Sequence, residues 1–136
     1  MADQHKPSKT LNITLWIAQI LLAATFIWAA SMKLFQPIEK LSAMWPWVGQ
    51  VPVALVNFTG VIDLLGALGV ILPALFRVRP KLTPITAVAI IILMICASVF
   101  HIVRGEASVI GVNVIFALIA AFIAWGRFGK APIMPK

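Results

Sequence analysis

Residues 51–72 read VPVALVNFTGVIDLLGALGVIL, a long and almost entirely apolar run. A helix needs about 20 predominantly apolar residues to cross the hydrocarbon core of a bilayer, and this run is long enough. It contains a single charged residue, Asp63. It lacks the polar and apolar alternation that is typical of membrane β-barrel strands. The stretch therefore predicts a transmembrane helix that carries one carboxylate into the membrane.

Three further apolar stretches flank this one, at residues 11–35, 83–101 and 109–125. The chain has 136 residues, of which 62% are hydrophobic and 11% are charged, whereas soluble domains have about 25% charged residues. We therefore expect an all-α membrane protein, a bundle of four transmembrane helices over residues 11–127. Residues 1–10 and 128–136 are expected to be tails, and residues 36–50 an interfacial loop. Pro73 is expected to stop the second helix, and Thr83 is available to cap the third.

The distribution of basic residues predicts how the bundle is oriented. Eight Lys or Arg side chains fall in the two tails and the 77–81 loop when Arg127 is counted with the C-terminal tail, against three in the opposite connections. The positive-inside rule then places both termini in the cytoplasm. The formal net charge of +7 is accounted for by this orientation and by contact with anionic lipid headgroups. No nucleic-acid partner is needed to explain it.

Polar residues fall on the faces that the helices are expected to turn inward. Asp63 is the most informative, because a carboxylate near the bilayer centre must be paired, protonated or solvated. Its depth matches that of Gln19 on the first helix, so the two are expected to meet near mid-membrane. A structural hydrogen bond between helices is the alternative to a ligand or proton site.

The most specific hypothesis is a small-molecule pocket that opens at the end of the bundle opposite the termini. Gln19 and Asp63 would form its floor, and Asn57 and Asn113 its walls. Lys33 and His101 would form the rim, with Trp45 and Trp47 as a lid close to the mouth. The competing interpretation of the pocket is a closed bundle. Lys33 could instead snorkel to the headgroups, and Trp45 and Trp47 could serve only to anchor the loop at the membrane interface.

The inventory of metal-binding side chains is small. Cys96 is the only cysteine, and His5 and His101 are the only histidines. A single cysteine gives no intrachain disulfide and no thiolate cluster, and bis-histidine haem needs a second intramembrane histidine. The sequence therefore predicts no metal site and carries no haem or iron–sulfur signature.

Several motifs taken in order resemble the DoxX-like family of small four-helix membrane proteins. They are Lys33-Leu34-Phe35, the 60–73 stretch around Asp63, Ala97–His101 with Arg104-Gly105-Glu106, and Gly126-Arg127. The family usually has Glu where this chain has Asp63, which shortens the reach of the carboxylate. The resemblance implies a protein of the bacterial cytoplasmic membrane with links to quinol oxidase, thiosulfate:quinone oxidoreduction or oxidative-stress complexes.

Three functions are consistent with these features. The first is an accessory of membrane redox or stress-response systems that binds a quinone, a quinol or another small amphiphile, rather than an independent oxidoreductase. The second is a chaperone or interaction subunit with a membrane-protein partner or a second copy of itself. The third is a small proton-coupled transporter, which the position of the carboxylate on the second rather than the first helix disfavours.

Overall fold

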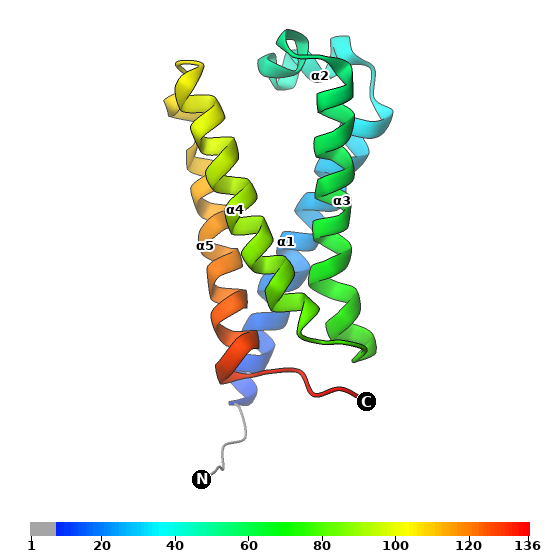
Figure 1. Ribbon diagram of the computed structural model, residues 1–136, viewed down its shortest axis with the longest axis vertical. Coiled ribbons are helices and arrows are strands. Elements are labelled where there is room, and N and C mark those ends of the chain that lie inside the picture. Colours follow the sequence, from blue (N-terminus) through cyan, green and yellow to red (C-terminus); the bar gives the residue numbers. More distant parts are fainter. Residues whose placement is uncertain (1–7) are drawn as a thin grey trace.

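The computed structural model describes residues 8–136, and this part of the chain is helical with no strand (Figure 1). Four helices are long and apolar enough to cross a membrane, which confirms the predicted fold class. They are α1 (Lys9–Phe35), α3 (Val53–Phe76), α4 (Leu82–Val103) and α5 (Gly111–Trp125), the last of which runs on into a π-helical turn, η3 (Gly126–Lys130). Most of the proposed 1–10 tail, including His5, lies outside the described residues.

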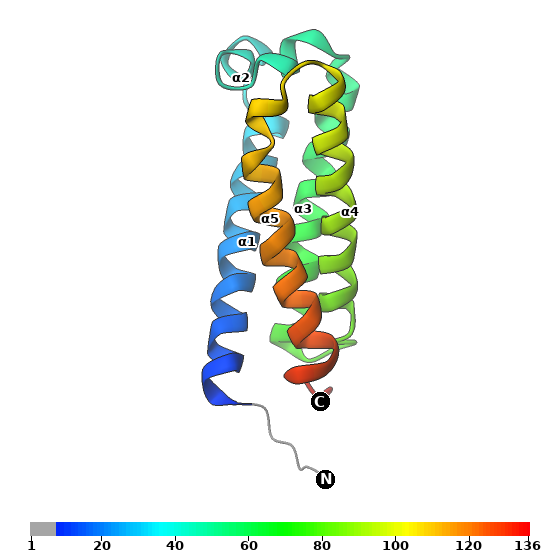
Figure 2. The same cartoon turned by 90° about the vertical axis from the view of Figure 1, so that its left-hand side faces the viewer.

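The helices pack as two pairs, with α1 along α3 and α4 along α5 (Figures 1 and 2). The beginning of α1 and the C-terminal segment lie at one end of the bundle, which we call the terminal end. The α4–α5 pair diverges from α3 toward the other end, which we call the distal end (Figure 1). The core that joins the pairs consists of buried Leu, Ile, Val, Phe and many Ala side chains, among them Leu22, Phe26, Ala67, Ala87 and Ile123. Small residues allow membrane helices to approach closely. The many alanines of this core therefore explain how the two apolar helix pairs pack together.

The 36–50 loop is folded at the distal end. It forms a short helix, α2 (Ile38–Met44), and a 3-10 helix, η1 (Pro46–Gln50). Leu41 and Val48 from this segment form a second small core with Val56 of α3. Trp45 and Trp47 pack against that core, so the two tryptophans are held in place by the fold of the loop. The connection between α4 and α5 contains one more 3-10 turn, η2 (Ala107–Val109).

The expectation that Pro73 stops the second helix is wrong, because Pro73 lies inside α3. The helix continues to Phe76 and ends where Arg77 adopts a left-handed backbone with φ of 57°. A proline inside a helix has no N–H for the carbonyl four residues earlier, here that of Gly69. In a membrane such a freed carbonyl needs another partner, because lipid offers no hydrogen bonds.

Thr83 of α4 approaches this freed carbonyl, and the neighbouring Val70 carbonyl accepts from side chains of both α4 and α1. Thr83 Oγ1 lies 3.4 Å from the Gly69 carbonyl oxygen and 3.3 Å from that of Val70. Gln19 Nε2 donates to the same Val70 carbonyl at 2.9 Å. Thr83 therefore does not cap α4, whose N-cap residue is Lys81, and instead compensates for Pro73.

Candidate functional site

The distal half of the bundle contains a buried ion pair between α1 and α3. Lys33 Nζ lies 2.8 Å from Asp63 Oδ2, and the two side chains are 14% and 9% exposed. Asp63 faces the interior because it shares a face of α3 with Gly60 and Ala67, both buried. Gly60 also allows close packing, since a Cβ there would lie 3.0 Å from Lys33 Cβ. Of the three states expected for this carboxylate, paired, protonated or solvated, the structure shows the paired one, and the shorter side chain of Asp63 reaches its partner directly.

Two tryptophans of the folded loop lie close to this ion pair. Lys33 Nζ is 6.0 Å from the ring centroid of Trp45 and 5.7 Å from that of Trp47. These distances are within the range of cation–π attraction. Trp45 also makes an edge-to-face contact with Trp28 of α1 at 5.7 Å between centroids. Lys33 is thus held between a carboxylate and two aromatic faces, so it does not snorkel freely.

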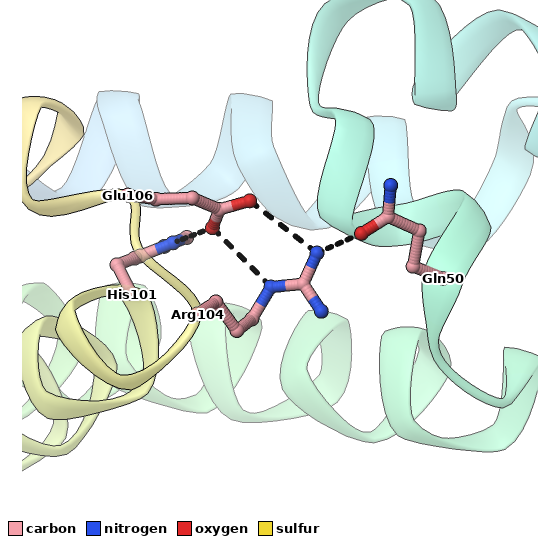
Figure 3. A network of polar contacts seen from close by, with 4 residues as sticks. All are labelled: Gln50, His101, Arg104 and Glu106. Carbon is pink, nitrogen blue, oxygen red and sulfur yellow. Dashed lines mark hydrogen bonds and ion pairs between the residues drawn. The ribbon is translucent and has the colours of Figure 1, made fainter.

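A polar network links the distal end of α4 to the 36–50 loop (Figure 3). His101 Nδ1 donates to Glu106 Oε1 at 2.9 Å, and Arg104 donates to both Glu106 oxygens at 3.3 Å. Arg104 also donates to the side-chain oxygen of Gln50 in η1. The hydrogen bond from His101, followed by that from Arg104, lowers the pKa of Glu106 below its ordinary value of 4.5. The network therefore contains an ionised Glu106 at neutral pH.

Trp47 connects the network to the ion pair. Its ring makes edge-to-face contacts with Phe100 at 5.8 Å and with His101 at 6.4 Å between centroids. One aromatic ring therefore lies near both Lys33 and His101. We call Lys33, Trp45, Trp47, Asp63 and His101 the distal site. It unites five of the residues that the sequence analysis grouped as a rim, a lid and part of a floor.

The structure does not bring Gln19 to Asp63, so the expected pairing is wrong. Gln19 is fully buried and donates to the Val70 carbonyl, seven residues along α3 from Asp63, or about 10 Å at the rise of a helix. Its own side-chain oxygen accepts from Arg127 Nε at 2.7 Å. The matching of depths failed because α3 continues to Phe76, well past residue 72 from which the depth of Asp63 was counted, whereas α1 begins at Lys9, close to the expected residue 11.

The two asparagines proposed as walls are not part of the buried interior. Asn57 is exposed on α3, so the expected inward orientation is wrong, because it lies on the edge of the arc that contains Gly60 and Asp63. Asn113 is half-buried near the beginning of α5. Neither side chain makes a hydrogen bond to another residue that the structure describes.

Arg127 is the buried residue that sequence reasoning misplaced. It is 3% exposed, although the charge count assigned it to the cytoplasmic tail. Its guanidinium donates to Gln19 and Asn12 of α1 and to the Ala131 carbonyl, the last two at 2.8 and 2.7 Å from Nη1. Asn12, Trp16 and Gln19 recur at helical spacing on α1, and this polar stripe is the signal that could have indicated a buried cation.

A model of the DoxX-like family matches residues 17–123. The chain belongs to the DoxX-like family. No match was found among the curated proteins or the solved structures. The matched region includes the whole distal site, whereas Arg127 lies beyond it. With the four apolar helices, family membership makes this chain a multi-pass integral membrane protein.

The distal site can donate hydrogen bonds and hold charge within an apolar setting. An ammonium group has three N–H donors, and Asp63 takes one from Lys33. The aromatic rings give flat apolar surfaces next to these donors. Among residues 8–136 no group of three His, Cys, Asp or Glu side chains is placed to hold a metal ion.

Proposed function

We propose that this protein binds a quinone, a quinol or a similar small amphiphile at the distal site, as an accessory of a membrane redox or stress-response system. The observation that carries the proposal is the Lys33–Asp63 ion pair beneath Trp45 and Trp47. Membrane proteins seldom bury ionisable groups without a functional reason, because each costs free energy of insertion. Ligand sites are typically apolar and aromatic with a few well-placed polar groups, and this site has that composition.

Each group has a role in such binding. An unused N–H of Lys33 would donate to a carbonyl oxygen of the ring, while Asp63 holds the ammonium in position. The tryptophan rings would pack against the flat face of the ligand. Because the chain has one cysteine, it lacks the thiolate set of an iron–sulfur cluster, which favours an accessory role over independent electron transfer.

The experiment is to extract the full-length protein with its surrounding native lipid and to analyse the extract by mass spectrometry. We expect a quinone or another small amphiphile to be enriched over its share of the bulk membrane. Lys33→Met should reduce the enrichment about tenfold, since a hydrogen bond to a charged group contributes about 1.5–3 kcal/mol. Lys40→Met, which removes an exposed lysine of α2, is the matched control and should have no effect.

Two results would contradict the proposal. One is an extract whose small amphiphiles match the bulk membrane. The other is an equal loss of ligand in the Lys33 and Lys40 variants. The same extract reports whether a partner chain or a second copy accompanies the protein, which tests the interaction-subunit hypothesis separately.

A further inference from the structure

An open cleft of about 450 Å³ lies at the terminal end, between the beginning of α1 and the end of α3. The C-terminal segment forms one of its sides and runs beneath the bundle (Figure 1). This segment is fixed to α3, because Arg77 Nε donates to the Met134 carbonyl at 2.8 Å and Lys136 N donates to the Arg77 carbonyl at 3.1 Å. The cleft is therefore part of the fold, at the opposite end of the molecule from the distal site.

The lining of the cleft is positively charged on one part and apolar on another. Lys9 at the start of α1 and Arg77 at the end of α3 contribute the charges, together with the polar side chain of Asn12. The rest of the lining consists of Trp16, Ala74, Leu75 and apolar residues of the C-terminal segment. None of the described lining residues is acidic, so the two cations are not neutralised within the cleft.

Arg127 is a third cation close to the cleft, although it is not one of the lining residues. Arg127 donates to Asn12 and lies 5.6 Å from the ring centroid of Trp16, and both of those residues line the cleft. All its partners in the described part of the chain are neutral, and its Nη2 group is buried there without a hydrogen-bond acceptor. A buried charge with no counter-charge is costly, and a nearby anion would offset that cost.

We propose that this cleft binds the phosphate headgroup of an anionic phospholipid. The phosphate would lie between Lys9 and Arg77, in the field of Arg127, and the glycerol and upper acyl chains would contact the apolar lining. The ends of α1 and α3 are the ends of membrane spans, where lipid headgroups are found. Juxtamembrane Lys and Arg residues attract anionic headgroups, and here two of them converge on one cleft instead of being dispersed.

Two observations favour a lipid over free phosphate or a soluble anion. Much of the lining is apolar, which suits the part of a lipid below its phosphate and offers nothing to a small ion. The side chains next to the cleft include exposed Leu75 and Phe76, so the apolar part continues onto the lipid-facing surface of α3. Lys9, Asn12, Trp16 and Arg127 lie outside the region that the family model matches, whereas Arg77 lies within it.

The test is native mass spectrometry of the detergent-purified full-length protein, titrated with short-chain phosphatidylglycerol and, separately, with phosphatidylcholine of the same chain length. We expect the anionic lipid to bind more tightly by at least about tenfold. Lys9→Gln should remove most of that preference without disturbing the C-terminal segment, because Lys9 contributes only charge. Lys9→Gln with Arg77→Gln should abolish it.

The control is the double variant Arg79→Gln and Lys81→Gln, which removes two exposed charges from the same end of the bundle but none from the cleft. It should keep the preference. An equal loss in both double variants would show attraction by overall charge and would overturn the proposal. Displacement of the lipid by an equal concentration of inorganic phosphate would also overturn it, since the occupant would then be a soluble anion.

Discussion

Lys33 and Asp63 illustrate how a buried ion pair constrains both of its partners. The pair stabilises each charge only while both are present, because either one alone would be a charge in a largely apolar setting. Removing one partner is therefore expected to cost more than removing both. This distinguishes a paired lysine from one that merely extends to the headgroups.

We predict that Lys33→Met destabilises the purified protein by about 3–5 kcal/mol, the range measured when one partner of a buried pair is lost. The double variant Lys33→Met with Asp63→Leu should recover a large part of that loss, because no charge is left unpaired. Thermal unfolding in detergent measures both effects. If the loss of unfolding free energy in the double variant equalled the sum of the losses in the two single variants, the two residues would not be coupled.

The acidic group at the distal end gives a prediction for pH. Hydrogen bonds from His101 and Arg104 lower the pKa of Glu106 in the folded protein below the 4.5 of an ordinary glutamate. A group with a lowered folded pKa binds fewer protons than the unfolded chain, so its stabilising contribution is present above about pH 4.5 and is lost as the pH falls through the folded pKa.

We therefore predict that the Glu106→Gln variant loses less thermal stability than the parent when the pH is lowered from about pH 6 to about pH 3. This window of about three pH units includes the ordinary pKa of a glutamate side chain. Glu39→Gln, which changes an exposed acid of α2, serves as the comparison. Should the Glu39 and Glu106 variants follow the same pH curve, the network would contribute nothing to stability.

At the scale of the helices, Pro73 and its partners show how a break in backbone hydrogen bonding is repaired from outside the helix. Pro73 leaves the Gly69 carbonyl without its usual donor, and Thr83 of α4 approaches it. The two helices are close at this level, since a Cβ on Gly69 would lie 2.4 Å from Thr86 Oγ1. The packing of α3 on α4 and the continuity of α3 beyond the proline are thus linked.

We predict that Thr83→Val destabilises the protein by about 1 kcal/mol, while Thr25→Val, which removes a hydroxyl bonded within its own helix, has a smaller effect. In a Pro73→Ala background the helix regains its own N–H, so Thr83→Val should cost less there. Thermal unfolding of the parent, the Thr83→Val and Pro73→Ala variants and the double variant forms a double-mutant cycle. An unchanged cost in the two backgrounds would mean that Thr83 does not compensate for Pro73.

For the whole molecule, the arrangement of the helices places the 77–81 loop and the C-terminal segment at one end and the folded α2–η1 loop at the other (Figure 1). Arg127 is buried rather than in the tail, so it no longer belongs in the charge count. The remaining basic residues still favour the terminal end, and a cytoplasmic location of that end stays a prediction.

We predict that Arg79→Cys, made in a Cys96→Ser background, is not labelled by a membrane-impermeant thiol reagent added to intact cells. Gly49→Cys in η1 should be labelled under the same conditions, because that residue lies at the opposite end and is exposed. The reverse pattern would require both termini to face away from the cytoplasm.

The four membrane-spanning helices could be predicted from the amino-acid sequence alone, because length and apolar composition are local properties that the bilayer requires of every span. The sequence also indicated that Lys33, His101 and the two tryptophans belong to one end of the bundle, since depth along a helix follows from residue spacing, but it placed Asp63 near mid-membrane with Gln19. The partners of these polar side chains could not be predicted in the same way, and the folded bundle shows them. Lys33 rather than Gln19 meets Asp63, and Gln19 instead meets Arg127, which is 108 positions away. Pairing depends on how far each helix extends, how it is rotated and how the C-terminal turn folds back, and these follow from packing between distant segments.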